Sequence, residues 1–124
     1  MAELSQFFKS IIDQDTEPVV VCNLLHEIVY MNPAAVEHYM DEGGSKLIGL
    51  VIFDCHSHAS AEKIDRVVKW FSESRENNIV HTSYNPKKDK DFYMVALRDD
   101  DGKLIGYYEK HISRVKDPTP VYGR

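Results

Sequence analysis

The sequence contains no apolar run long enough to cross a membrane. Its longest apolar stretches, residues 18–22 and 47–53, are far shorter than the roughly 20 residues that span a bilayer. The first residues are acidic and then polar, so they do not resemble a secretory signal, which starts with basic residues and continues with an apolar stretch. We therefore expect a soluble cytoplasmic protein without a membrane partner.

Cysteine and positive charge are also scarce. Cys22 and Cys55 are the only two cysteines, and in a reducing compartment we expect free buried thiols rather than a disulfide. The 15 Lys and Arg residues are outnumbered by 20 Asp and Glu residues, which gives a net charge of −5 at pH 7. Because proteins bind the nucleic-acid backbone through clustered Lys and Arg, this composition argues against a general nucleic-acid binder.

What the chain does have is the composition of an ordinary soluble protein. Hydrophobic residues make up 43% and charged residues 28% of its 124 residues, and such a length supplies one hydrophobic core. We expect one domain at residues 18–115. An N-terminal helix or cap at residues 1–17 should precede it, and a flexible tail at residues 116–124 should follow.

Three helices are predicted from apolar spacing and capping residues. Residues 3–14 place their apolar side chains on one helical face, and Pro18 prevents a continuation. Asn32 and Pro33 are typical of a helix start, so a short helix should run to about Met40. A longer helix is predicted at residues 61–75 with Ser60 as its cap. Residues 45–58 give no clear signal.

Five strands are predicted from runs rich in β-branched and aromatic residues. The pair Asp101-Gly102 is a strong signal for a hairpin turn between the last two strands. Two hairpin sets around a block of helices favour an α+β fold, with a five-stranded antiparallel sheet and helices packed on one face. The predicted strands cover residues 19–24, 28–31, 79–84, 92–98 and 104–112.

The order of these elements and several short motifs resemble the PAS domain family. Residues 20–23 and 28–35 resemble its opening hairpin and the "Asn-x-Ala" start of its first helix. Residues 47–54 are similar to its "Gly…Phe-Asp" segment before the long helix. Residues 98–106 resemble its last hairpin, in which an acidic-Gly turn precedes a strand with a glycine. The resemblance covers about residues 5–115.

This resemblance implies a sensor module that binds a small ligand or a protein partner in signal transduction and is not an enzyme. PAS domains that pass a signal to a following domain often end in Asp-Ile-Thr, whereas this chain reads His111-Ile112-Ser113. We therefore expect a standalone module without an attached effector. Its output would act through assembly, as a homodimer, or through a separate effector protein.

The resemblance also implies where a ligand would bind, between the sheet and the helices. The competing interpretation is that the same apolar residues only fill the core, as apolar stripes usually do. An enzyme with acid-base chemistry at a His and a carboxylate, such as Asp54 or Glu109, is a further alternative. The candidate pocket residues are Tyr39, Phe53, Cys55, His56, Ile64, Val68, Phe71 and Met94.

Six histidines suggest haem as a possible cofactor, because haem iron takes imidazole ligands. In haem-binding PAS domains the histidine usually lies on the long helix, and residues 61–75 contain none. His56 could instead have a structural role, and zinc would need Cys22 or His81 as an additional ligand. The motif around the reactive cysteine of flavin-binding PAS domains is absent at Cys55. The candidate haem or metal ligands are His56, His58, His81 and His111.

A dimer interface is predicted on the outer face of the sheet and the N-terminal helix. The last strand carries Glu109 and Lys110 where a central strand would be expected to be apolar, so one face must be wet, paired or covered by a partner. The resemblance adds that PAS proteins commonly form dimers through these surfaces. The candidate interface residues are Phe7, Phe8, Ile11, Tyr107 and Tyr108.

Overall fold

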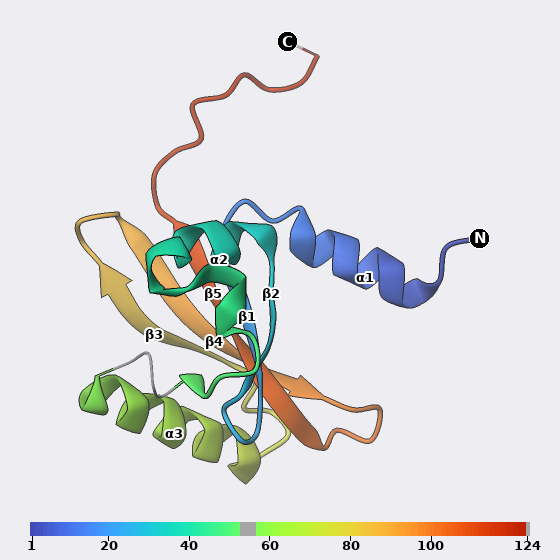
Figure 1. Cartoon of the computed structure of the whole chain (residues 1–124), viewed down its shortest axis with the longest axis vertical. Coiled ribbons are helices and arrows are strands. Elements are labelled where there is room, and N and C mark those ends of the chain that lie inside the picture. Colours follow the sequence, from blue (N-terminus) through green and yellow to red (C-terminus); the bar gives the residue numbers. More distant parts are fainter. Residues whose placement is uncertain (53–56, 124) are drawn as a thin grey trace.

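The protein is an α+β fold built on one five-stranded antiparallel sheet (Figure 1). The computed structural model describes residues 1–52 and 57–123. Along the sheet the strand order is β2-β1-β5-β4-β3, which confirms the predicted fold class. The strands are β1 (Val19–Asn23), β2 (Ile28–Met31), β3 (Ile79–Asn85), β4 (Lys90–Arg98) and β5 (Leu104–Ser113).

Helices and 3-10 turns cover the inner face of this sheet. They are α2 (Pro33–His38), η1 (Met40–Glu42), η2 (Gly44–Leu47) and α3 (His58–Glu73). Asn32 caps α2 as predicted, because its side chain accepts a hydrogen bond from the Ala35 amide at 2.9 Å. The predicted start of α3 was wrong by three residues. Ser57 is the cap, since its hydroxyl accepts from the Ser60 amide at 3.2 Å.

Strand pairing decides which side chains reach the core. Cys22 lies opposite Tyr107, and Met94 lies opposite Glu109. Because strand side chains alternate between faces, residues 107, 109 and 111 of β5 point inward, while residues 108 and 110 point outward. Tyr107 has no exposed surface, so its prediction as a dimer-interface residue was wrong. Packing against Cys22 and the inner helices makes it a core residue.

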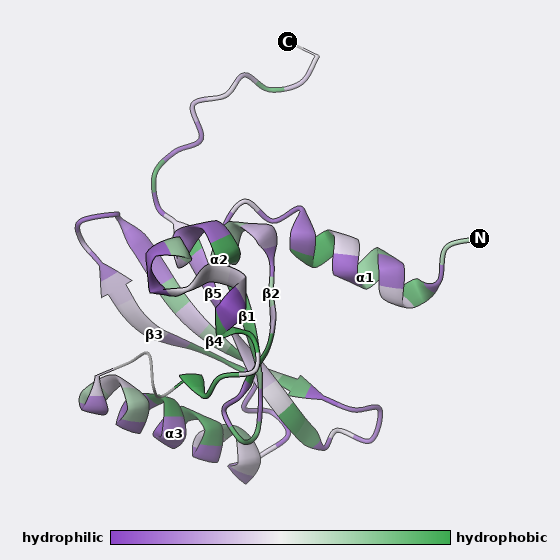
Figure 2. Ribbon diagram, viewed as in Figure 1, coloured by the Kyte–Doolittle hydropathy of each residue, from purple (hydrophilic) through white to green (hydrophobic). Residues whose placement is uncertain are grey.

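The core lies between the inner face of the sheet and the helices α2 and α3. Figure 2 shows hydrophobic residues along the side of α3 that faces the sheet and hydrophilic residues on its outer turns. This burial of apolar surface is the main stabilising contribution to the fold. The buried cluster consists of Val20, Cys22, Ile28, Met31, Ala35, Leu47, Ile52, Ile64, Phe71, Met94 and Tyr107.

Helix α1 (Leu4–Asp13) extends away from this body and buries none of its residues (Figure 1). Fully buried Asn32 ties its end to the domain. The Asn32 side-chain amide donates to the carbonyl of Ile12 at 3.0 Å and to that of Glu17 at 3.1 Å. Its side-chain oxygen also accepts from the Val19 amide at 2.9 Å. One buried side chain therefore connects the end of α1, the start of β1 and the start of α2.

Candidate functional site

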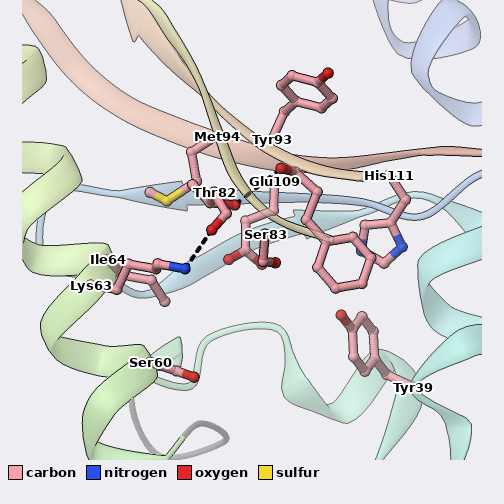
Figure 3. Close-up of a pocket in the computed structure, with 11 residues that line it drawn as sticks. Tyr39, Ser60, Lys63, Ile64, Thr82, Ser83, Tyr93, Met94, Glu109 and His111 are labelled. Atoms are coloured by element: carbon pink, nitrogen blue, oxygen red, sulfur yellow. Dashed lines mark hydrogen bonds between the residues drawn. The ribbon is translucent and has the colours of Figure 1, made fainter. Parts of the chain in front are cut away.

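One cavity of about 240 Å³ lies between α3, the end of α2 and the inner face of the sheet (Figure 3). The bend that makes room for it is a β-bulge, because the pairing of β3 with β4 shifts register between His81 and Ser83. Bulges bend a strand and redirect its side chains. The lining residues are Tyr39, Ser60, Lys63, Ile64, Thr82, Ser83, Phe92, Tyr93, Met94, Glu109 and His111.

The pocket candidates from the sequence divide into three groups. Tyr39, Ile64 and Met94 line the cavity. Phe71 is fully buried in the core and Val68 packs against that core, so neither of these two lines the cavity. The remaining candidates, Phe53, Cys55 and His56, lie outside the described residues, as does Asp54.

His111 is the polar group most deeply placed in the cavity wall. Its side chain comes from the inner face of β5, is only 8% exposed, and stacks at 4.3 Å between ring centroids against Phe92. Burial, together with the nearby His38 and Lys90, lowers its pKa to about 4. The ring is therefore neutral at pH 7. Its Nδ1 atom is buried and has no hydrogen-bond partner among the described residues.

The other two described candidate ligands lie outside the cavity. His58 is the first residue of α3, but its side chain is 89% exposed and contacts Glu62 at 2.9 Å. His81 lies on β3, stacks on Tyr93 and contacts Asp91 at 2.7 Å. Of the candidate histidines that the structure describes, His111 is thus the one that meets the cavity.

Lys63 reaches across the edge of the cavity from α3 to β3. Its Nζ donates a hydrogen bond to the backbone carbonyl of Thr82, the residue at the bulge. Within the described part of the chain, no carboxylate lies close enough to form an ion pair with Lys63. Lys63 is an exposed residue, so its ammonium meets this uncharged acceptor and water.

The sequence prediction missed several lining residues. Phe92 could have been found, because it lies two residues from Met94 on the same face of β4. Lys63 gave no such signal, because neighbouring positions on a helix point in different directions, and Lys63 is exposed whereas Ile64 is buried. Thr82 and Ser83 could not have been found, since a bulge changes the alternation of side chains and left no signal in this strand.

Cys22 is buried and chemically quiet. Burial raises the pKa of its thiol to about 12, and the negative charge of Glu109 contributes, so the thiolate form required for nucleophilic or metal-ligand chemistry is not populated at pH 7. Among the residues that the structure describes, no three His, Cys, Asp or Glu side chains are grouped to hold a metal ion. The described helices likewise include none that could span a membrane.

A second concavity, of about 450 Å³, lies on the opposite side of the sheet, between α1 and the outer face of the central strands β1, β5 and β4. Phe8, Ile11 and Tyr108, three of the predicted interface residues, line it. Phe7, on the same helix, is 58% exposed. The structure therefore gathers three of the five interface candidates around one groove, which we call the α1 groove.

Solved structures with the same architecture decide the fold family. A PAS domain from Colwellia psychrerythraea matches with a TM-score of 0.66 and 14% identity, covering 90% of this chain and 97% of that one. The chain is a PAS-fold protein. The PAS domain of BvgS from Bordetella pertussis matches at a TM-score of 0.62 and 14% identity, over 90% and 87% of the two chains.

One further match has a title that names a cofactor. The Aer2 receptor from Vibrio cholerae, described as a dual PAS-heme oxygen sensor, is similar at a TM-score of 0.54 and 18% identity, covering 80% of this chain and 95% of that chain. No family model and no curated protein matches this sequence. At such low identity these likenesses show the PAS fold, while the chemistry of the site has to be argued from this chain's own residues.

Proposed function

We propose that this PAS-fold protein is a sensor module that binds a small molecule in the cavity beside His111 and catalyses no reaction. The observation that carries the proposal is a cavity of about 240 Å³ whose wall combines apolar side chains with the buried, neutral ring of His111. Pockets that bind small molecules are usually mostly apolar with a few convergent polar groups. The likeness to the Aer2 receptor, which is described as an oxygen sensor, supports a sensing role.

The position of the cavity supports signalling through α1. Tyr39, which lines the cavity, is the C-terminal cap of α2. Asn32 caps the other end of that helix and holds the end of α1. A ligand that favours one position of α2 would therefore bias the position of α1, in the way that differential binding shifts a population.

A small ligand fits the cavity better than haem does. A cavity of about 240 Å³ is smaller than the roughly 300–1,000 Å³ of pockets that hold drug-sized ligands, and haem is larger than those ligands. Catalysis is not part of the proposal, because no carboxylate orients His111 through its Nδ1 within the described residues.

Homodimerisation through α1 is a second proposal, favoured by a separate observation. An amphipathic helix normally buries its apolar face, yet α1 leaves Leu4, Phe7, Phe8 and Ile11 more than half exposed. A second copy of the chain, placing its own α1 against the α1 groove, would cover both surfaces. Such self-complementary contacts are typical of two-fold dimers.

Native mass spectrometry of the purified chain tests the ligand proposal. We expect a non-covalent small-molecule adduct, either co-purified or acquired from a cell extract, that is lost on denaturation. Ser83→Phe, which fills the cavity from its rim, should lose the adduct. The matched variant Ser72→Phe, at an exposed serine that does not line the cavity, should keep it. An unliganded mass under both conditions, or an adduct retained by Ser83→Phe, would count against the proposal.

A further inference from the structure

The two ends of the cavity differ in chemistry. Lys63, Thr82 and Ser83 gather at one end, while Tyr39 and His111 lie at the other (Figure 3). Between them lie the apolar side chains of Ile64, Phe92 and Met94, with Glu109 beside Met94 on the sheet. A ligand that fits this space therefore has an apolar body and a polar group at the Lys63 end. The same arrangement also fixes the orientation of the ligand in the cavity.

Size limits the ligand further. An apolar cavity of ~150 Å³ holds benzene, so the cavity beside His111, at about 240 Å³, accommodates a somewhat larger molecule. A molecule of this size has a single ring or a branched chain, with one or two polar substituents. Peptides and nucleotides exceed this space.

The charge of the polar group follows from Lys63. Its ammonium has only the uncharged carbonyl of Thr82 as a hydrogen-bond partner in the described chain. That contact is already assisted by the charge of the ammonium, but an anion at this position would add the attraction between two opposite full charges, which a neutral carbonyl lacks. Glu109 is the cavity's carboxylate, but it projects from β5 on the opposite wall and already has an interaction of its own.

We infer that the cavity binds a small carboxylic acid with an apolar body, whose carboxylate pairs with Lys63 and whose other end contacts His111. This inference rests on the proposed ligand-binding function and narrows it to one chemical class. The Ser83 hydroxyl is placed to donate a second hydrogen bond to the carboxylate. The chain's net charge of −5 disfavours anions in general, so a measured preference for an anion has to come from the site.

Three probes of matching shape and different charge test the inference: benzoate, benzamide and benzamidinium. Each is titrated into the full-length chain at pH 7, and binding is followed by NMR chemical shifts. We expect benzoate to bind about two- to fivefold more tightly than benzamide, the ratio expected from one ion pair at an exposed lysine. Benzamidinium should bind more weakly than both.

A matched pair of variants assigns the preference to Lys63. Lys63→Gln should reduce the affinity for benzoate to that for benzamide, while leaving benzamide binding unchanged, which also shows that the variant is folded. Lys69→Gln removes an equal charge from the same helix, at an exposed residue that does not line the cavity, and should keep the preference.

The possible failures are distinguishable. Equal or tighter binding of benzamide or benzamidinium, or an unchanged preference in Lys63→Gln, would overturn the carboxylate inference and leave ligand binding in place. If none of the three probes perturbs the residues that line the cavity at millimolar concentration, the cavity takes no such ligand. The proposed function then fails together with the inference.

Discussion

At the scale of single residues, His111 is a buried histidine that also lines the cavity. It is neutral because burial and the neighbouring His38 and Lys90 disfavour its charged form. The sequence named His111 among four candidate histidines, but nothing in the sequence separated it from His58 and His81. What separates them is the pairing of β5 with β4, which places His111 opposite Phe92 on the inner face.

His111 makes the protein sensitive to mild acid. Its pKa is about 4 in the folded chain and 6.5 in an unperturbed histidine, so the unfolded chain binds more protons between these values. The free energy of unfolding therefore falls as pH drops from 6.5 towards 4. The pKa difference corresponds to a loss on the order of 3 kcal/mol. Urea denaturation at several pH values across this range measures the slope.

Two variants show whether that slope belongs to His111. His111→Gln should flatten the pH dependence, whereas His58→Gln, at an exposed position, should leave it as in the unaltered chain. Some slope remains in His111→Gln, because burial also lowers the pKa values of His26 and His38. Identical slopes for His111→Gln and the unaltered chain would show that His111 is not the acid-sensitive group.

At the scale of elements, the sequence predicted α1, α2, α3 and all five strands, and the structure confirms them with shifts at their ends. Apolar periodicity and capping residues are local signals, and local signals suffice for these elements. The attachment of α1 was not predictable, since Asn32 contacts residues 12 and 17 across a distance in sequence that no local pattern encodes. Figure 2 shows the mixed apolar and polar surface that this attachment leaves on α1.

Helix α1 should therefore control assembly. Phe7→Glu places a charge on its exposed apolar face, and a buried charge without a partner is costly. We expect the dissociation constant of the dimer to rise by about tenfold or more, as measured by analytical ultracentrifugation over a concentration series. Leu25→Glu makes the same kind of change at an exposed residue in the β1–β2 turn and should leave the dimer intact. A chain that is monomeric throughout the series, or a Phe7→Glu dimer of unchanged affinity, would refute the α1 interface.

At the scale of the whole molecule, the order of elements was sufficient to predict the PAS fold, whereas the cavity had to be found in three dimensions. A cavity depends on how tightly a helix packs against a sheet and on a bulge such as that at Thr82, and neither leaves a pattern in the sequence. Most of the candidate pocket residues from the sequence lie between Phe53 and Phe71. In the structure, β3, β4 and β5 contribute most of the described walls.

The central claim is that a small molecule binds in the cavity beside His111, and the ring of His111 reports on this directly. We would record the ¹⁵N resonances of the histidine side chains in the full-length chain, with and without benzoate. We predict that the His111 ring nitrogens shift on titration and that those of the exposed His58 stay unchanged. Saturable binding that leaves the His111 resonances in place would contradict this claim.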